Sequence, residues 1–202
     1  MNFVRKNNPF TPQSKFEPTI LEEVLFRLFK HLRNGQIEVG RANAYSNLYF
    51  SWANFDEFKI KDNIKTNYKD QDFAIFKNVI FTLQDKQKVA MSVPVLAFEC
   101  KTYLDKTMLE SSVATAEKIK AGNPSCRFCI VTERYSVDKS VDIKSSRIDQ
   151  IYVLKKDATS NNYKERKIEF EVVERLFNDV LEHLNNNWTD ITKNIQENGL
   201  VL

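Results

Sequence analysis

The 202-residue chain is poor in the residues that define several protein classes. It has three cysteines, four scattered glycines and two histidines. An odd number of cysteines argues against a disulfide-bonded scaffold, and scattered glycines form no glycine-rich phosphate loop. No stretch approaches the ~18 consecutive apolar residues of a membrane span, and the opening MNFVRKNNPF lacks the apolar segment of a secretory signal. These absences predict a protein with reduced thiols, located in the cytoplasm and binding no membrane.

Apolar residues are plentiful by contrast. The chain contains 15 Phe, 7 Tyr and 2 Trp, too many to leave in water, which excludes general disorder. A domain of this length buries roughly 70% of its unfolded surface and needs no disulfide or metal to fold. We therefore expect one domain over residues 1–202, comprising an N-terminal arm at 1–16, a core at 18–155 and C-terminal helices at 168–202.

Hydrophobic periodicity predicts an α/β fold with a mixed central β-sheet flanked by helices. Segment 36–58 fits helix, strand or loop. The predicted helices are 18–33 (opened by Pro18 and ended by Asn34-Gly35), 104–122, 168–184 and a short one at 188–197, and the predicted strands are 73–83, 93–101, 127–133 and 148–154, with a polar loop at 157–167. Strand 93–101 is apolar enough to be buried on both faces. The helix after it predicts a parallel crossover to strand 127–133.

Two opposite charges end the apolar strand 93–101. Glu99 and Lys101 are two residues apart, so on a strand they point to the same side, about 6–7 Å from each other. An acid and an ammonium group at the end of a buried strand are costly to desolvate without a partner or a role. The plain alternative is a strand-end pair that simply reaches solvent.

Two further carboxylates, Asp70 and Asp72, precede the strand that begins at Phe73. If this strand pairs with 93–101, Asp72 lies beside Glu99. Converging carboxylates repel each other, and Mg²⁺, which prefers oxygen ligands and retains several waters, relieves that repulsion. A metal-bound water beside Lys101 suits hydrolysis of a phosphodiester. The alternative for both aspartates is ordinary turn chemistry before a strand.

This order of residues resembles the PD-(D/E)xK nuclease core. The segments FEPTILEE (16–23), KDQDFAI (69–75) and ECKTYLDK (99–106), with KTYLDKTM at 101–108, further resemble subunits of type II restriction endonucleases of the BbvCI kind, which cut CCTNAGC-type sites. The likeness covers roughly residues 14–135. It implies Mg²⁺-dependent cleavage of double-stranded DNA by Asp72, Glu99 and Lys101, with Asp72 and Glu99 as metal ligands. No proline precedes the aspartate, so Asp70 remains an alternative ligand.

The first predicted helix offers one more acidic residue. On a helical wheel, Glu22 falls at the border of the apolar face, whereas Glu23 faces solvent. Many nucleases that share this core carry an acidic residue on this helix, so the resemblance makes Glu22 a candidate contact of the metal or of Lys101. The alternative is a first-turn acid that complements the helix dipole.

A cluster of lysines is a candidate DNA contact. Lys59, Lys61, Lys65 and Lys69 lie within eleven residues, either as a solvated loop or as a stripe that neutralises phosphates. The nearby aromatic residues of segment 45–58 could stack on bases, but ordinary core packing is the favoured interpretation.

The cysteines and histidines suggest no catalytic or metal site. Cys126 and Cys129 form a CxxC pattern, but a zinc site needs four ligands, and on a strand these two side chains point to opposite faces. We expect buried thiols there, and helix-end positions for His31 and His183.

The sequence thus predicts a DNA endonuclease that acts as a homodimer or as a heterodimer with a related subunit, because cutting both strands takes two active sites. Two alternatives stay open. One is a nuclease of the same core in DNA repair or recombination, and the other is a DNA-binding subunit that does not cut.

Overall fold

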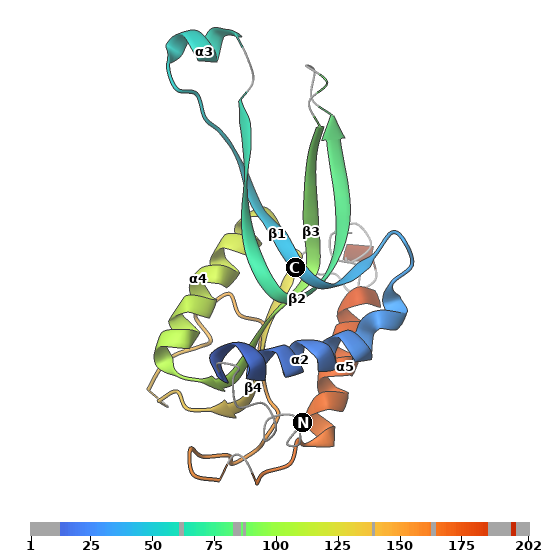
Figure 1. The fold of residues 1–202 in the computed structure, drawn as a ribbon, viewed down its shortest axis with the longest axis vertical. Helices are drawn as coiled ribbons and strands as arrows, with labels where there is room; N and C mark the ends of the chain where they lie inside the picture. Colours follow the sequence, from blue (N-terminus) through green and yellow to red (C-terminus); the bar gives the residue numbers. More distant parts are fainter. Residues whose placement is uncertain are drawn as a thin grey trace.

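The computed structural model describes residues 13–60, 63–82, 86, 88–138, 140–162, 165–185 and 195–196. These residues form an α/β fold with one mixed five-stranded sheet flanked by helices (Figure 1), as the sequence predicts. The elements are α2 (Gln13–Phe29), η1 (Lys30–Leu32), β1 (Glu38–Phe50), α3 (Phe55–Ile60), β2 (Ile64–Thr82), β3 (Lys88–Leu104), α4 (Lys106–Gly122), β4 (Arg127–Tyr135), β5 (Gln150–Val153) and α5 (Phe170–Asn185). No described helix combines the length and apolar character needed to cross a membrane.

The sheet changes from antiparallel to parallel at β3. The strand order is β1-β2-β3-β4-β5, with β2 antiparallel to both β1 and β3, and with β3, β4 and β5 mutually parallel. Helix α4 connects β3 to β4, so the predicted parallel crossover is confirmed. Asp105 caps this helix by accepting a hydrogen bond from the Met108 amide at 2.8 Å.

Two apolar clusters cover the two faces of the sheet. Helices α2 and α5 pack on one face, represented by Leu25 and Leu176, and α4 packs on the other, represented by Ile119. In β3, residues 96–100 are all buried, which confirms a strand enclosed on both faces. Glu99 therefore lies within this buried run, and Lys101 directly follows it.

The first helix starts earlier than predicted, and α2 ends at Phe29, after which η1 continues to Leu32, one residue before the predicted end at 33. Helix α2 begins at Gln13, so Pro18 lies inside it rather than at its start. At the other end the predicted stop at Asn34-Gly35 is confirmed. Gly35 has φ +80°, a conformation that favours glycine, and Asn34 Oδ1 accepts hydrogen bonds from the amides of Gln36 and Ile37 at 3.1 and 3.0 Å.

Strand β2 is much longer than predicted. It begins at Ile64, not Phe73, so Asp72 lies inside the strand and turn chemistry does not explain it. The same result makes the predicted solvated loop around Lys65 and Lys69 wrong, because both residues belong to β2. Its first half reads as a loop in the sequence because it is polar and most of it faces solvent.

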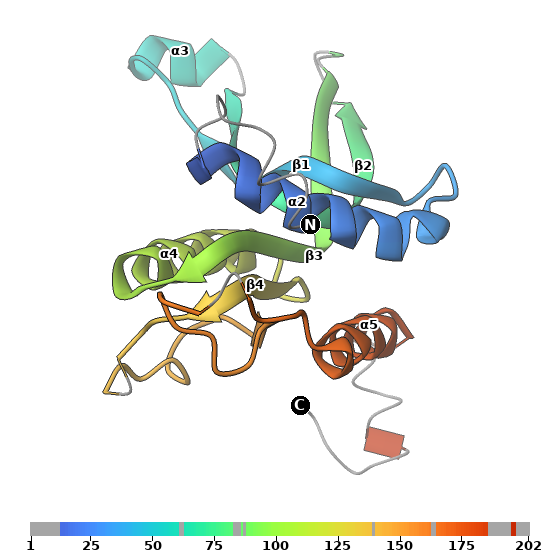
Figure 2. The same cartoon turned by 60° about the horizontal axis from the view of Figure 1, so that its bottom comes forward.

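The undecided segment 36–58 becomes a strand and a short helix. Residues 45–50 of β1 pair with residues 64–68 of β2, and α3 closes their far end; we call this unit the distal ribbon. It projects from the same end of the molecule as the β2–β3 hairpin (Figures 1 and 2). The expected core packing of the aromatic residues is wrong, because Phe50, Phe55 and Phe58 are 61%, 68% and 54% exposed.

Two predictions lie largely outside the described residues. Of the N-terminal arm at 1–16, only 13–16 are described, and they belong to α2. Of the short C-terminal helix at 188–197, only 195–196 are described. The helix predicted at 168–184 is confirmed as α5.

Candidate functional site

The structure brings Asp72, Glu99 and Lys101 together on neighbouring strands. Phe73 of β2 lies opposite Phe98 of β3, which makes Asp72 level with Glu99. Asp72 Oδ2 accepts a hydrogen bond from the Cys100 amide at 2.8 Å, and Lys101 Nζ lies 3.1 Å from Glu99 Oε2. Three charged groups from two strands therefore share one place on the sheet.

A β-bulge sets the direction of Asp72. Gly40 of β1 pairs with Ala74 and Ala42 pairs with Gln71, so two residues of β2, Asp72 and Phe73, face the single residue between Gly40 and Ala42. Bulges bend a strand and re-aim its side chains, and they occur often beside active sites. Here the bulge frees Asp72 from the ladder to β1 and turns its carboxylate to β3.

Glu99 is held on two sides. It is 8% exposed, and its Oε2 lies 2.6 Å from Ser112 Oγ of α4 in addition to its contact with Lys101. Ser112 Oγ is also 2.9 Å from the Met108 carbonyl oxygen, but its single proton goes preferentially to the carboxylate because a charged acceptor makes the stronger bond. A buried carboxylate needs such partners, and they also fix its orientation.

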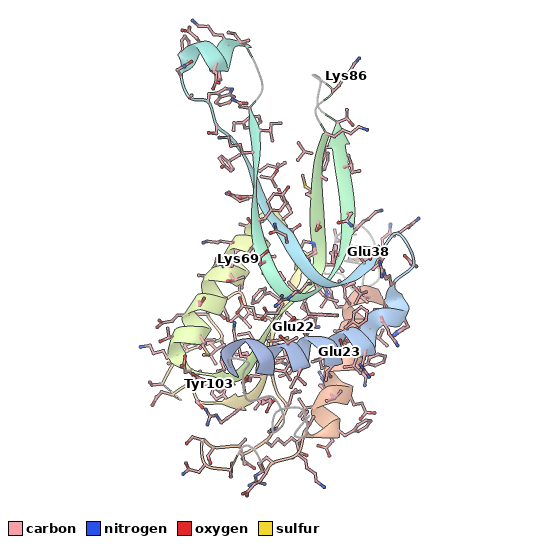
Figure 3. All side chains as sticks on the ribbon, viewed as in Figure 1. Glu22, Glu23, Glu38, Lys69, Lys86 and Tyr103 are labelled. Carbon is pink, nitrogen blue, oxygen red and sulfur yellow. The ribbon has the colours of Figure 1, made fainter. Side chains whose placement is uncertain are left out.

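Glu22 lies at the border of the buried face of α2, as predicted, and Glu23 points outward (Figure 3). Their side chains are 13% and 55% exposed. Glu22 contacts neither Lys101 nor Glu99 in any described hydrogen bond or ion pair. Its carboxylate instead pairs with Arg41 of β1 through both oxygens, at 3.0 Å from Nε and 3.2 Å from NH2.

The electrostatics of Glu22 connect it to the same site. Burial raises the pKa of Glu22, the Arg41 guanidinium opposes this rise, and the negative charge of Asp72 adds to it. Arg41 occupies the β1 position opposite the bulge at Asp72. Sequence reasoning missed Arg41 because it lies in segment 36–58, where no periodicity identified a strand.

The pKa of the Cys100 thiol is affected by the charges of all four candidate residues. Burial raises the pKa of its thiol well above the ordinary value, the charges of Asp72, Glu22 and Glu99 raise it further, and Lys101 lowers it. All four candidate residues therefore act on one point of β3.

Between Asp70 and Asp72, the geometry favours Asp72 as the second carboxylate. Asp70 pairs with Asn43 of β1 and is exposed, and two residues along a strand place it about 6–7 Å farther from Glu99. Only Asp72, among the described contacts, is bonded to β3.

The two carboxylates suit a hard divalent cation that keeps most of its water. Within the described residues, no group of three or more His, Cys, Asp or Glu side chains could hold a metal ion, so the protein offers two carboxylates here rather than a closed cage. Asp72 Oδ1 and Glu99 Oε1 make no hydrogen bond to any described residue. Two free carboxylate oxygens, completed by water and phosphate oxygens, match the coordination that Mg²⁺ adopts in phosphate-transfer sites.

The three described candidate DNA-binding lysines lie on two different elements. Lys59 lies on α3, 3.2 Å from Asp56 Oδ1 and over the ring of Phe55, whereas Lys65 and Lys69 lie on β2. Lys61 is outside the described residues. Lys69 lies near α4 (Figure 3) and lines a hollow together with Lys118.

The thiols and histidines occupy the expected places. Cys100, Cys126 and Cys129 are free and buried, with Cys126 and Cys129 on opposite faces of the sheet. Burial raises the pKa of Cys129 to about 12, so this thiol is unreactive. His31 lies in η1 and His183 in the last turn of α5.

Comparison with known proteins places the chain in one class, the restriction endonucleases, which are DNA nucleases. The family model of the Bpu10I restriction endonuclease matches residues 13–162. The chain belongs to this Bpu10I restriction endonuclease family.

A solved structure has the same fold. It is described as the native BbvCI A2B2 tetramer at low resolution, and it is 20% identical in sequence with a TM-score of 0.71 over 90% of this chain and 70% of that chain. No curated protein matches this sequence significantly. The family match supports a restriction endonuclease, and the solved structure shows the same fold.

Proposed function

We propose that this chain is a subunit of a type II restriction endonuclease that hydrolyses phosphodiester bonds of double-stranded DNA at a specific site, with Mg²⁺ as cofactor. The observation that carries the proposal is the convergence of Asp72, Glu99 and Lys101 on adjacent strands. The arrangement corresponds to a PD-(D/E)xK core in which Asp72 takes the place of the first acid.

Asp72 and Glu99 would hold the metal, each through the oxygen that no described residue uses. When bound, Mg²⁺ supplies a Lewis acid that makes water a stronger acid and neutralises charge on the phosphate. Ser112 and Lys101 fix Glu99, and the Cys100 amide fixes Asp72. The carboxylates are thus oriented before DNA arrives, which reduces the reorganisation that the reaction requires.

Lys101 acts on the attacking water or on the charged phosphate oxygens. Its ammonium group lies 3.1 Å from Glu99 and is 28% exposed, so it is anchored but reachable by substrate. As a cation it orients the water and stabilises the developing negative charge; as a neutral amine it takes the proton of the water.

Glu22 acts through Arg41 rather than as a metal ligand in this proposal. The Arg41 side chain is 71% exposed and is held at two points by Glu22. A guanidinium in this position binds a DNA phosphate next to the scissile bond. Glu22 is then a positioning residue.

Cutting both DNA strands requires two such sites, so we propose that the chain works as a homodimer or with a related subunit. The A2B2 tetramer formed by BbvCI supports an assembly of this kind. We further propose a CCTNAGC-type target, which the sequence resemblance over residues 14–135 implies. Lys59, Lys61, Lys65 and Lys69 would contribute phosphate contacts, and residues 1–202 would form one domain that acts in the cytoplasm.

Digestion of plasmid DNA tests the function. We expect Mg²⁺-dependent double-strand cuts that give discrete fragments, and sequencing of the ends reports target and stagger. Lys101→Ala should abolish cutting while DNA binding and thermal unfolding stay unchanged. Lys106→Ala is the matched control, because Lys106 is exposed and 3.9 Å from Glu110.

Two results would contradict the proposal. Equal cleavage with and without EDTA would show that the reaction needs no Mg²⁺. Normal cleavage by Lys101→Ala would show that the site containing Lys101 is not the catalytic one. Retarded DNA migration without strand breaks under any divalent metal, alone or with a related subunit, would identify a non-catalytic subunit. Preferential cutting of branched over plasmid DNA would identify a repair or recombination nuclease.

A further inference from the structure

The two faces of the distal ribbon differ in chemistry. Residues directly opposite in a ladder share a face, so the pairs Asn47–Asn67 and Tyr49–Lys65 lie on one face, and the pairs Leu48–Thr66 and Phe50–Ile64 on the other. The first face carries amides, a phenol and an ammonium group, and we call Asn47, Tyr49, Lys65 and Asn67 the polar ribbon face. The second face is mainly apolar.

The polar ribbon face is open to solvent and chemically unused within the molecule. All four of its residues are exposed. The side-chain amides of Asn47 and Asn67 make no hydrogen bond to any described residue. Paired, exposed amides on a two-stranded ribbon leave donors and acceptors free for a ligand.

A positively charged hollow lies next to the polar ribbon face, on the side toward α4. A hollow of about 510 Å³ between the ribbon and α4 is lined by Asn47, Asn67, Lys69 and Lys118, together with Glu117. Glu117 is neutralised by Arg147 at 3.2 Å, whereas neither lysine forms an ion pair with a described residue. The hollow is therefore positive overall and suits phosphate groups.

We infer that the polar ribbon face enters the major groove of the target duplex and reads base edges there. This inference rests on the proposed function and names the element that recognises the target. The major groove, about 12 Å wide, admits a two-stranded β-ribbon, and asparagine pairs with adenine through two hydrogen bonds. Lys69 and Lys118 contact the phosphates beside the groove.

The position of the ribbon relative to the catalytic residues fits one DNA molecule. Strand β2 runs from Lys65 through Asn67 to Asp72 without a break. At about 3.3 Å per residue, Lys65 and Asn67 lie at most about 23 and 17 Å from Asp72. Both distances are shorter than one turn of duplex DNA, about 34 Å, so the ribbon and the cleavage site reach the same target.

Aromatic packing on the apolar face and the capped helix α3 stabilise the distal ribbon. Trp52 stacks on Phe50 with ring centroids 5.6 Å apart and meets Phe58 edge-on at 4.8 Å. Asn54 and Glu57 cap α3, since the Glu57 amide donates to Asn54 Oδ1 at 2.9 Å and Glu57 Oε2 accepts from the Ala53 amide at 2.8 Å. A rigid support of this kind holds reading side chains in place.

Selection from a library of randomised DNA duplexes tests the inference, with Ca²⁺ in place of Mg²⁺ so that bound DNA stays intact. The full chain should enrich one consensus sequence. Asn47→Ala or Asn67→Ala should lose preference at one or two positions, with relative affinities there reduced roughly 5- to 100-fold. Lys69→Ala, at a residue assigned to a phosphate, should weaken binding to all duplexes evenly and reduce by about 1 the slope of the logarithm of affinity against the logarithm of salt concentration.

Thr66→Ala is the matched control, because Thr66 lies on the same strand but on the other face. It should keep the wild-type consensus, and thermal unfolding should be alike for all four variants. An unchanged consensus in both asparagine variants would overturn the inference, as would a wild-type chain that enriches no sequence. Loss of subunit assembly without loss of sequence preference would overturn it too and make the ribbon a protein interface.

The inference and the proposed function fail separately. A chain that enriches a consensus through Asn47 and Asn67 but does not cut plasmid DNA in Mg²⁺ upholds the reading ribbon and overturns the nuclease. A chain that cuts at discrete sites that neither substitution alters upholds the nuclease and overturns the reading ribbon.

Discussion

Ser112 of α4 donates a hydrogen bond of 2.6 Å to Glu99 of β3. The crossover helix therefore holds the carboxylate that we assign to the metal. We predict that Ser112→Ala reduces the cleavage rate about 10-fold, since Glu99 keeps Lys101 but loses its second anchor, and raises the Mg²⁺ concentration needed for half-maximal activity. Thr115→Ala is the control, because Thr115 is buried on the same helix and its described hydrogen bond goes to the Ser111 carbonyl rather than to Glu99. Equal cleavage rates for Ser112→Ala and Thr115→Ala would show that Ser112 has no role in positioning Glu99.

The pair formed by Glu22 and Arg41 separates two roles for the acidic residue of α2. If Glu22 positions Arg41 on a phosphate, Glu22→Gln and Arg41→Ala should each weaken DNA binding roughly 5- to 10-fold. Each should also reduce by about 1 the slope of the logarithm of affinity against the logarithm of salt concentration. The Mg²⁺ concentration that gives half-maximal cleavage should be the same in both variants as in wild type. Glu23→Gln, one residue on and paired with Arg27, should change neither. A higher Mg²⁺ midpoint in Glu22→Gln with unaltered DNA binding would instead identify Glu22 as a metal ligand.

Gly122 allows α4 to approach the base of the distal ribbon. A Cβ atom there would lie 1.7 Å from the Ser46 carbonyl oxygen, and the neighbouring Asn123 donates a hydrogen bond to the Tyr45 carbonyl at 2.8 Å. Gly122→Ala should destabilise the fold by about 1–3 kcal/mol, because the obstacle is backbone. Ser111→Ala on the exposed side of the same helix should stay within about 0.5 kcal/mol of wild type. Denaturant unfolding measures both, and an unchanged midpoint for Gly122→Ala would refute the close contact.

His183 makes stability depend on pH. Burial lowers its pKa below the ordinary 6.5, although a contact of 3.2 Å between Nε2 and the Val95 carbonyl opposes this shift. The unfolded chain therefore binds a proton at higher pH than the folded chain does. Stability is retained above pH 6.5 and declines as the pH falls from there through the folded pKa. Thermal unfolding between pH 5 and 7.5 should show a smaller decline for His183→Gln than for wild type, and parallel curves would contradict the assignment.

The sequence predicted the elements whose signals are local. An unbroken apolar run marked β3 around Leu96, helical spacing marked α2 and α5, and Asn34-Gly35 marked a helix end. The expected approach of Asp72 to Glu99 was conditional on pairing between their strands, and β2 and β3 do pair with these two residues at one level. These features depend on residues that are neighbours in the chain or in one ladder.

The features that the sequence did not predict have little local signal of their own. β1 is too polar toward its end to read as a strand, and it forms because β2 supplies its hydrogen bonds. Arg41 enters the site only through a bulge and a helix nineteen residues away. One local signal was overlooked: Asn54 followed by Glu57 is a helix-capping pattern, and it would have located α3 and with it the exposed aromatic residues.

The unbroken course of β2 has an evolutionary consequence. Residues on one strand alternate between faces, so inserting a single residue between Asn67 and Asp72 would turn one of them away from its present side. Insertions and deletions here are therefore confined to the tip around α3 or to compensated pairs. Related proteins that bind different DNA sequences should therefore differ by substitutions along β2. The number of residues between Asn67 and Asp72 should stay constant among them.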